Sequence, residues 1–284
     1  NEDGELVKKD IVFDEEKKQL RAKFFKSRAK FSRLDKFSDV FRLLSVVSAF
    51  DYIPNEKKDS FVNNNFLRKK LMLEIAKLRK QVMYIIKLHT SKENIAVSVD
   101  DNELKTKLPT ETQIKMLKQM VCTGFVDQVA VRADHLFPEE FKISSKSSVI
   151  NIPYIPVLAK KDTSKDIQDL CVYIHPTSIL SNVGEAPPRY IVYQTLQQNI
   201  NTMKTRMKPL CDIKSTPLVN IARKGSLLTY SKPLTGQGLK PVDISLTERY
   251  CYVVPRFGAS VDSDLKIGWE LNPVAVAQKK INGK

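Results

Sequence analysis

The residues best suited to chemistry in this sequence are basic side chains grouped at short spacing. Arg68, Lys69 and Lys70 are consecutive, and Arg79 and Lys80 form a second group shortly after them. Lysine and arginine neutralise phosphates, and RNA recognition combines that neutralisation with stacking and loop contacts. These five residues are therefore candidate RNA phosphate contacts. A solvated basic helix surface is the alternative interpretation.

Motifs for catalysis and for nucleotide or metal binding are absent from the sequence. It contains no G-x-x-x-x-G-K-[ST] loop, no G-x-S-x-G motif and no H-E-x-x-H motif. Its cysteines form no C-x-x-C pair and are expected to be free thiols in a reducing compartment: Cys122, Cys171, Cys211 and Cys251. We therefore predict no catalytic residue, no metal site and no cofactor site in this chain, which disfavours an independent enzyme.

The charge of the chain favours a polyanionic partner. The 284 residues include 47 Lys and Arg against 32 Asp and Glu, for a formal net charge of +15. Residues 1–90 alone hold 21 basic and 13 acidic side chains, a net charge of +8. The usual polyanion for an intracellular protein is nucleic acid, although charge alone does not separate RNA, DNA and acidic lipid. The sequence has no apolar run of membrane-spanning length, so we expect no membrane partner.

The first part of the chain has helical periodicity. Helices are expected over Asp14 to Lys36, Val40 to Phe50, Phe61 to about Leu88, and Thr110 to Gly124. In the third of these, apolar residues at three- and four-residue spacings predict a packed face, made of Phe66, Leu71, Ile75, Leu78, Val82 and Ile85. The basic residues lie on its other faces.

Beyond Gly124 the sequence changes to short segments rich in β-branched and aromatic residues. Strands are expected over residues 126–133, 148–157, 171–175, 190–196, 248–255 and 265–271, and a loop over 225–238. Several short strands after helices predict a small barrel or curled sheet. His175 falls at a predicted strand end, where the loops of small barrels meet nucleic acid, and a structural histidine is the alternative.

Five segments, in order, resemble the C-terminal accessory region of DEAH-box RNA helicases. In the helical part, Ser38 to Val47 resembles the motif G/S-D-x-L-x-L-L-x-V that begins the ratchet domain, and Asn65 to Leu67 with Ala76 to Val82 resembles N-F-L and I/L-R-x-Q-L. In the β-rich part, the matching segments are Gly124 to Ala130 (G-F/Y-x-x-x-V/A-A), Ile174 to Leu180 (I-H-P-S-S-x-L) and Pro188 to Gln194 (P-x-W/Y-V-x-Y-x-E). Residues 195–223 depart from the family pattern.

The resemblance implies an α+β fold in which a ratchet-like helical bundle precedes an OB-fold-like small β-barrel. It divides the chain into a basic helical linker or insertion at 1–30, a ratchet-like domain at 31–108, an OB-fold at 109–225 and a partial β-rich C-terminal extension at 226–284. The parent would be an ATP-dependent RNA helicase whose motor domains, with ATP and Mg, lie outside this chain. The first residue, Asn1, is not Met, so we expect a piece of a longer protein.

Within that family, Phe31 to Asp35 and Asp127 to Arg132 look closest to the nucleolar member of small ribosomal subunit assembly, which displaces a small nucleolar RNA from pre-rRNA. The implied partners are pre-rRNA or small nucleolar RNA, the motor domains in cis and a ribosome-assembly activator protein, all in the nucleolus. In the OB-fold, the candidate RNA contacts are Arg132, Lys142 and His175. The alternative function is a basic docking module that binds acidic assembly factors and scarcely contacts RNA.

Overall fold

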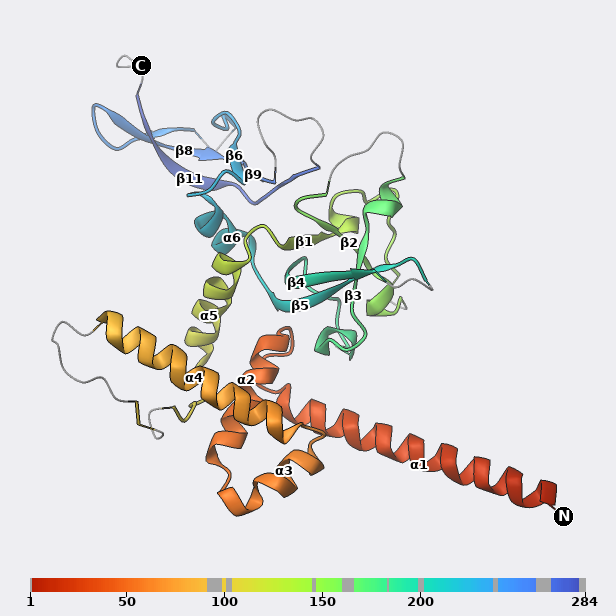
Figure 1. The fold of residues 1–284 in the computed structure, drawn as a ribbon. Helices are drawn as coiled ribbons and strands as arrows, with labels where there is room; N and C mark the ends of the chain where they lie inside the picture. Colours follow the sequence, from red (N-terminus) through yellow and green to blue (C-terminus); the bar gives the residue numbers. More distant parts are fainter. Residues whose placement is uncertain are drawn as a thin grey trace. The chain divides into compact units, whose positions relative to one another are not determined.

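The computed structural model describes residues 2–90, 99–100, 104–144, 147–159, 166–182, 184–198, 202–236, 240–258 and 267–280 (Figure 1). The chain divides into two compact units. The first consists of Asn1–Lys36 and Val40–Pro109, and the second of Phe37–Asp39 and Thr110–Lys284. Helices make up the described part of the first unit, and a closed barrel with further sheets makes up most of the second, so the predicted α+β fold class is confirmed.

The helices of the first unit pack around one small core. They are α1 (Glu2–Phe31), α2 (Asp39–Tyr52), η1 (Asn55–Lys57), α3 (Lys58–Asn64) and α4 (Lys69–Thr90). The buried residues come from all four α-helices: Phe31, Val46, Phe50, Val62 and Met72. The Phe61 ring packs against two of these residues, with its centroid 6.3 Å from that of Phe31 and 6.2 Å from that of Phe50.

One prediction for this unit is wrong, because the helix expected over Phe61 to Leu88 is interrupted at Asn65 and Phe66. Phe66 has a φ of 56°, in the left-handed region, and the N–H of Leu67 donates to the carbonyl of Val62 at 2.8 Å. This is the hydrogen-bonding pattern that ends helices, with phenylalanine where glycine is usual. Contacts with α1 hold the turn: the Ser27 hydroxyl donates to Asn65 Oδ1 at 3.1 Å, and the Phe66 ring packs edge-on against Phe24.

The packed face predicted for the long helix is also wrong for most of its residues. Met72 is buried and Ile75 is half-buried against the core. The other members of that face are exposed: Phe66, Leu71, Leu78, Val82 and Ile85. The spacing identifies an apolar stripe correctly, but the core of the first unit reaches only the N-terminal end of α4. The rest of α4 therefore presents apolar side chains to solvent.

The second unit begins with α5 (Glu111–Gly124), which starts after Thr110 as predicted and has a capping box there. Thr110 accepts a hydrogen bond from the N–H of Gln113, whose side chain accepts one from the N–H of Thr110. The closed barrel follows, in the order β1-β2-β3-β5-β4. Its strands are β1 (Val129–Arg132), β2 (Pro153–Pro156), β3 (Val172–Ile174), β4 (Tyr190–Gln198) and β5 (Thr205–Asp212). Neighbouring strands are antiparallel except β3 and β5, which are parallel.

The strands predicted for the barrel are confirmed for β1 to β4, whereas β5 and the following helix α6 (Ser215–Ala222) lie in the segment that departed from the family pattern. Short 3-10 turns connect the strands: η2 (Ala133–His135), η3 (Val149–Asn151), η4 (Ile167–Leu170) and η5 (Ile179–Asn182). Burial alternates along β5, so Met207, Pro209 and Cys211 point inward. The alternation matches the period of a half-buried strand.

Two three-stranded sheets follow α6. One has the order β10-β9-β6, made of Trp269–Glu270, Pro255–Phe257 and Leu228–Tyr230, and the other has the order β11-β8-β7, made of Val274–Lys279, Glu248–Val253 and Val242–Asp243. The loop predicted over 225–238 is therefore wrong where β6 lies. Of the strand predicted over 265–271, residues 265 and 266 lie outside the described residues. Trp269 stacks on Tyr190 of β4 with ring centroids 6.3 Å apart, within the core that the barrel shares with this sheet.

The four cysteines are buried free thiols. Burial raises the pKa of Cys122 and of Cys171 to about 12, which removes nucleophilic character at neutral pH. Across the described ranges, no group of three or more His, Cys, Asp or Glu side chains is arranged to hold a metal ion. Among the helices described, none combines the length and the apolar character needed to cross a membrane.

Candidate nucleic-acid interface

Parallel pairing of β3 with β5 brings an aromatic ring and several cations together on one face of the barrel. Tyr173 is the partner of Arg206 in the register, while their neighbours Ile174 and Met207 point into the core. The Tyr173 ring lies 5.0 Å from Lys204 Nζ and 5.6 Å from Arg206 Cζ. We call the group of Tyr173, His175, Lys204, Arg206 and Lys208 the Tyr173 surface.

Arg206 is the fixed element of the Tyr173 surface. Its Nη1 donates to the carbonyl oxygens of Ile150 and of Ile174, the second at 3.2 Å. Backbone carbonyls therefore hold the guanidinium beside the ring. Burial raises the pKa of the Tyr173 phenol, so the ring stays neutral at physiological pH. A neutral, electron-rich ring flanked by cations suits stacking on a base and contact with its phosphate.

His175 follows β3 and lies in the same group. Its own N–H donates to the carbonyl of Met207 at 2.9 Å, and the N–H of Thr177 donates to its Nδ1 at 3.2 Å. Burial lowers the pKa of the imidazole, and Lys208 and Arg206 lower it further. The ring is therefore neutral at pH 7 and carries its proton on Nε2, because Nδ1 accepts. His175 thus has local structural contacts, and its contact with RNA stays a prediction.

The two other residues predicted in the OB-fold differ in how they are held. Arg132 is tied down: its Nε lies 2.8 Å from Asp134 Oδ1, and its Nη1 donates to the carbonyl of Pro187 at 2.8 Å. Its charge is largely offset by Asp134, which gives it a structural role that the sequence did not indicate. Lys142 is exposed. RNA contact by either residue stays a prediction.

Four of the five basic residues predicted on the long helix are exposed. Arg68 immediately precedes α4, and Lys69 and Lys70 are its first two residues. Lys69 Nζ is 2.6 Å from Asp59 Oδ1 in a solvent-exposed pair. Lys80 is also exposed, farther along α4. An exposed pair of this kind contributes little to stability, so Lys69 can exchange partners at small cost. These residues therefore remain candidates for phosphate contact.

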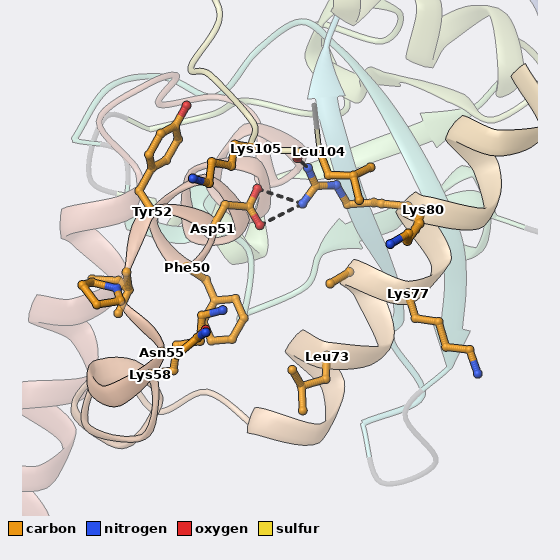
Figure 2. Close-up of a pocket in the computed structure, with 14 residues that line it drawn as sticks. Phe50, Asp51, Tyr52, Asn55, Lys58, Leu73, Lys77, Lys80, Leu104 and Lys105 are labelled. Carbon is orange, nitrogen blue, oxygen red and sulfur yellow. Dashed lines mark hydrogen bonds and ion pairs between the residues drawn. The ribbon is translucent and has the colours of Figure 1, made fainter. Parts of the chain in front are cut away.

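Arg79 is the exception, because structural contacts occupy its guanidinium. Nη1 lies 2.9 Å from Asp51 Oδ2, and dashed lines mark this ion pair at Asp51 in Figure 2. Nη2 donates to the carbonyl of Leu104 and to the hydroxyl of Thr106. The N–H of Thr106 donates to the same carboxylate at 3.0 Å, and the Ser48 hydroxyl donates to the Thr106 carbonyl at 2.6 Å. Arg79 and Asp51 thus join α2, α4 and the 104–106 segment. RNA contact by Arg79 stays a prediction.

Two of the segments used for the family resemblance meet inside the second unit. The Ser178 hydroxyl donates to Asp39, and the N–H of Ile179 donates to Asp39 Oδ1 at 3.2 Å. The Ser38 hydroxyl donates to the carbonyl of Leu210 at 2.8 Å. Ser38, Asp39 and Ser178 are all buried. Asp39 therefore holds the turn that follows His175 through Ser178 and Ile179, while Ser38 is bonded to β5.

Four members of the Tyr173 surface were missed from the sequence: Tyr173, Lys204, Arg206 and Lys208. The signal for the part in β5 was the alternation of polar and apolar residues from Arg206 to Pro209, which is typical of a strand with one buried face. Tyr173 stood two residues before His175, on the same face of the predicted strand. Only the register between β3 and β5 brings the two groups together.

The barrel defines the class of the second unit. A closed five-stranded barrel with these connections is the OB-fold, which binds oligonucleotides on the face of its second and third strands and with the loop between the fourth and fifth. Tyr173 lies on the third strand and Lys204 immediately precedes the fifth. Residues 117–225 match the family described as the oligonucleotide/oligosaccharide-binding (OB)-fold.

Comparison with known proteins extends the similarity to nearly the whole chain. "Probable ATP-dependent RNA helicase DHR1" of Saccharomyces cerevisiae is 67% identical over 268 residues, 94% of this chain and 21% of the relative. "Putative ATP-dependent RNA helicase PB1A10.06c" of Schizosaccharomyces pombe is 28% identical over 285 residues, 100% of this chain and 21% of the relative. "Probable ATP-dependent RNA helicase DHX37" of Homo sapiens is 26% identical over 181 residues, 63% of this chain and 13% of the relative.

The chain therefore spans about a fifth of the length of the first two relatives. The resemblance to the accessory region of an ATP-dependent RNA helicase is confirmed, and the second unit contains an OB-fold.

Proposed function

We propose that this chain is the RNA-binding accessory region of a DEAH-box RNA helicase and that the Tyr173 surface contacts RNA. The observation that carries the proposal is the Tyr173 ring between Lys204 and Arg206, on the strand and at the loop that OB-folds use for oligonucleotides. Lys204 and Lys208 would neutralise phosphates, while Arg206 positions the ring. None of these contacts reads a base edge, so binding should tolerate many sequences.

The motor domains that hydrolyse ATP would be supplied by the parent protein, in cis. The exposed apolar residues of α4 support such a partner, because Leu78, Val82 and Ile85 are each about half exposed. A contiguous apolar surface of this kind usually marks an interface. In this proposal α4 packs against another part of the helicase and turns its basic residues toward the RNA path.

Replacing Lys204 and Lys208 with Ala together should weaken single-stranded RNA binding and flatten its salt dependence. Each phosphate contact contributes roughly 0.7 to the slope of log affinity against log salt for single strands, so the double variant should lose about 1.4 from the slope. The measurement is fluorescence anisotropy with a labelled oligouridine, titrated at several salt concentrations. The matched control replaces the exposed Lys232 and Lys240 of the same unit. A wild-type slope in the double variant would remove the Tyr173 surface from the RNA path.

The finer assignment is to small ribosomal subunit assembly in the nucleolus, where the parent would displace a small nucleolar RNA from pre-rRNA with the help of an assembly activator. Its support is the subfamily resemblance at Phe31 to Asp35 and Asp127 to Arg132. Ultraviolet crosslinking of the full-length parent in cells should recover pre-rRNA at sites that pair with a small nucleolar RNA. Recovery of messenger RNA alone, or a fluorescent fusion outside the nucleolus, would contradict it.

A further inference from the structure

The first unit contains a pocket of about 670 Å³, which lies beside the helical core and includes Arg79 and Lys80 in its lining (Figure 2). Three parts of the unit form it: the end of α2 with the turn that follows, the middle of α4, and the segment at Leu104 and Lys105. The Asp51 to Arg79 ion pair, with its hydrogen bonds to residues 104 and 106, joins these three parts. The pocket wall is therefore held in place before any ligand binds.

The lining of the pocket is strongly positive. It contains one carboxylate, that of Asp51, and five cations: Lys58, Lys77, Arg79, Lys80 and Lys105. Arg79 pairs with Asp51 at 2.9 Å, and the lining residues together carry a formal net charge of +4. Figure 2 shows Lys77 and Lys80 on α4 at one side and Lys105 on the other. Such an arrangement favours an extended anion with several charges.

The apolar part of the lining favours an acidic peptide over RNA as the ligand of the pocket. Leu73 is 49% exposed in the pocket, and Ala76, Ile53 and Pro54 add further apolar surface. The Phe50 ring is only 3% exposed and its face is taken by the Lys58 ammonium, 5.0 Å away, so Tyr52, which is 53% exposed, is the lining aromatic residue with a ring open to an incoming group. An RNA backbone would satisfy the lysines but leave Leu73 uncovered. A peptide can satisfy both.

We propose that this pocket binds an acidic polypeptide segment that places one aliphatic or aromatic side chain against Leu73. Its carboxylates lie within reach of Lys77, Lys80 and Lys105, which line the pocket on opposite sides. The site is separate from the Tyr173 surface, so the two proposals can fail independently.

The test uses the whole 284-residue chain and a labelled twelve-residue peptide of Asp and Glu with a central Leu-Phe pair. Fluorescence anisotropy should show binding that a Lys77→Glu, Lys105→Glu double variant weakens by about tenfold or more, because two attractions become repulsions. Leu73→Asp should weaken it as well. The matched control is Lys18→Glu, on α1 of the same unit and exposed but outside the pocket lining, with an effect below about twofold.

Three outcomes would overturn the proposal. An equal loss of binding in the Lys18→Glu control would show general charge attraction. Unchanged affinity after the peptide's Leu-Phe pair is replaced with Ser-Ser would remove the apolar part of the site. Displacement of the peptide by a labelled oligouridine, with the pocket variants losing RNA binding to the same extent, would assign the pocket to RNA instead. RNA binding at the Tyr173 surface is measured in a separate experiment. If that surface does not bind RNA, the peptide-binding result for the pocket still stands.

Discussion

Replacing Asp39 with Ala is expected to lower the free energy of unfolding of the second unit by about 3 kcal/mol. Asp39 is 9% exposed, and its carboxylate accepts hydrogen bonds from the Ser178 hydroxyl and the Ile179 N–H. The substitution leaves both donors in a buried site without their acceptor, and each unsatisfied buried group costs about 1 to 3 kcal/mol. Replacing the donors and the acceptor together with apolar groups would cost less, because no buried polar group would then be left without a partner.

The measurement is urea unfolding followed by tryptophan fluorescence. Trp269 is the single tryptophan in the sequence and is 2% exposed in the second unit, so its emission reports that unit alone. The control replaces the exposed Glu140 with Ala and should change stability by less than about 0.5 kcal/mol. Ser178→Ala should cost less than Asp39→Ala, and the double variant should cost less than the sum of the two single variants, because they share one hydrogen bond. A wild-type midpoint for Asp39→Ala would contradict the network.

This network also explains why two short motifs far apart in the sequence carried the family resemblance. Ser178 and Asp39 are 139 residues apart and form one buried hydrogen bond. The sequence shows the residue types of both motifs, but no local rule of spacing pairs them. Their pairing depends on how the barrel closes, so the resemblance could be recognised while its physical cause could not.

The secondary structure was predictable where local signals decide it. The start of α5 follows from the Thr110 and Gln113 capping box, and β1 to β4 follow from β-branched runs between turn residues. The break at Asn65 was not predictable in this way, because no glycine or proline marks it. There the left-handed conformation of Phe66 is sustained by packing on Phe24 and by the Ser27 hydrogen bond to Asn65, both of which come from α1.

The candidate site was predictable only in part, for a related reason. His175 could be placed at a strand end from its own neighbours, but Arg206 lies in a strand that the family pattern did not cover. Parallel pairing between β3 and β5 is a long-range property, and it alone puts Arg206 beside Tyr173. Charge patterning identified the basic groups on α4, yet it could not show which of these cations has a carboxylate partner within the fold.

Arg79→Ala is expected to lower the free energy of unfolding of the first unit by about 2 kcal/mol, a value between those of exposed and of fully buried ion pairs. The intermediate value follows from burial, since the side chains of Arg79 and Asp51 are 27% and 12% exposed. The substitution leaves the Asp51 carboxylate without its cation and releases the carbonyl of Leu104 and the hydroxyl of Thr106. Far-ultraviolet circular dichroism during urea unfolding follows this helical unit, and Lys77→Ala on the same helix is the control.

Arg79→Lys separates the two roles available to this residue. Lysine keeps the positive charge that a phosphate contact needs, but its single ammonium cannot bridge Asp51, Leu104 and Thr106 as the guanidinium does. We expect Arg79→Lys to retain RNA affinity near that of the wild type while remaining destabilised by about 1 kcal/mol. Full stability in this variant would contradict the structural role. Because the same ion pair holds the 104–106 segment against α2 and α4, the Arg79→Ala variant should also weaken binding of the acidic peptide, even though Lys77, Lys80 and Lys105 are unchanged.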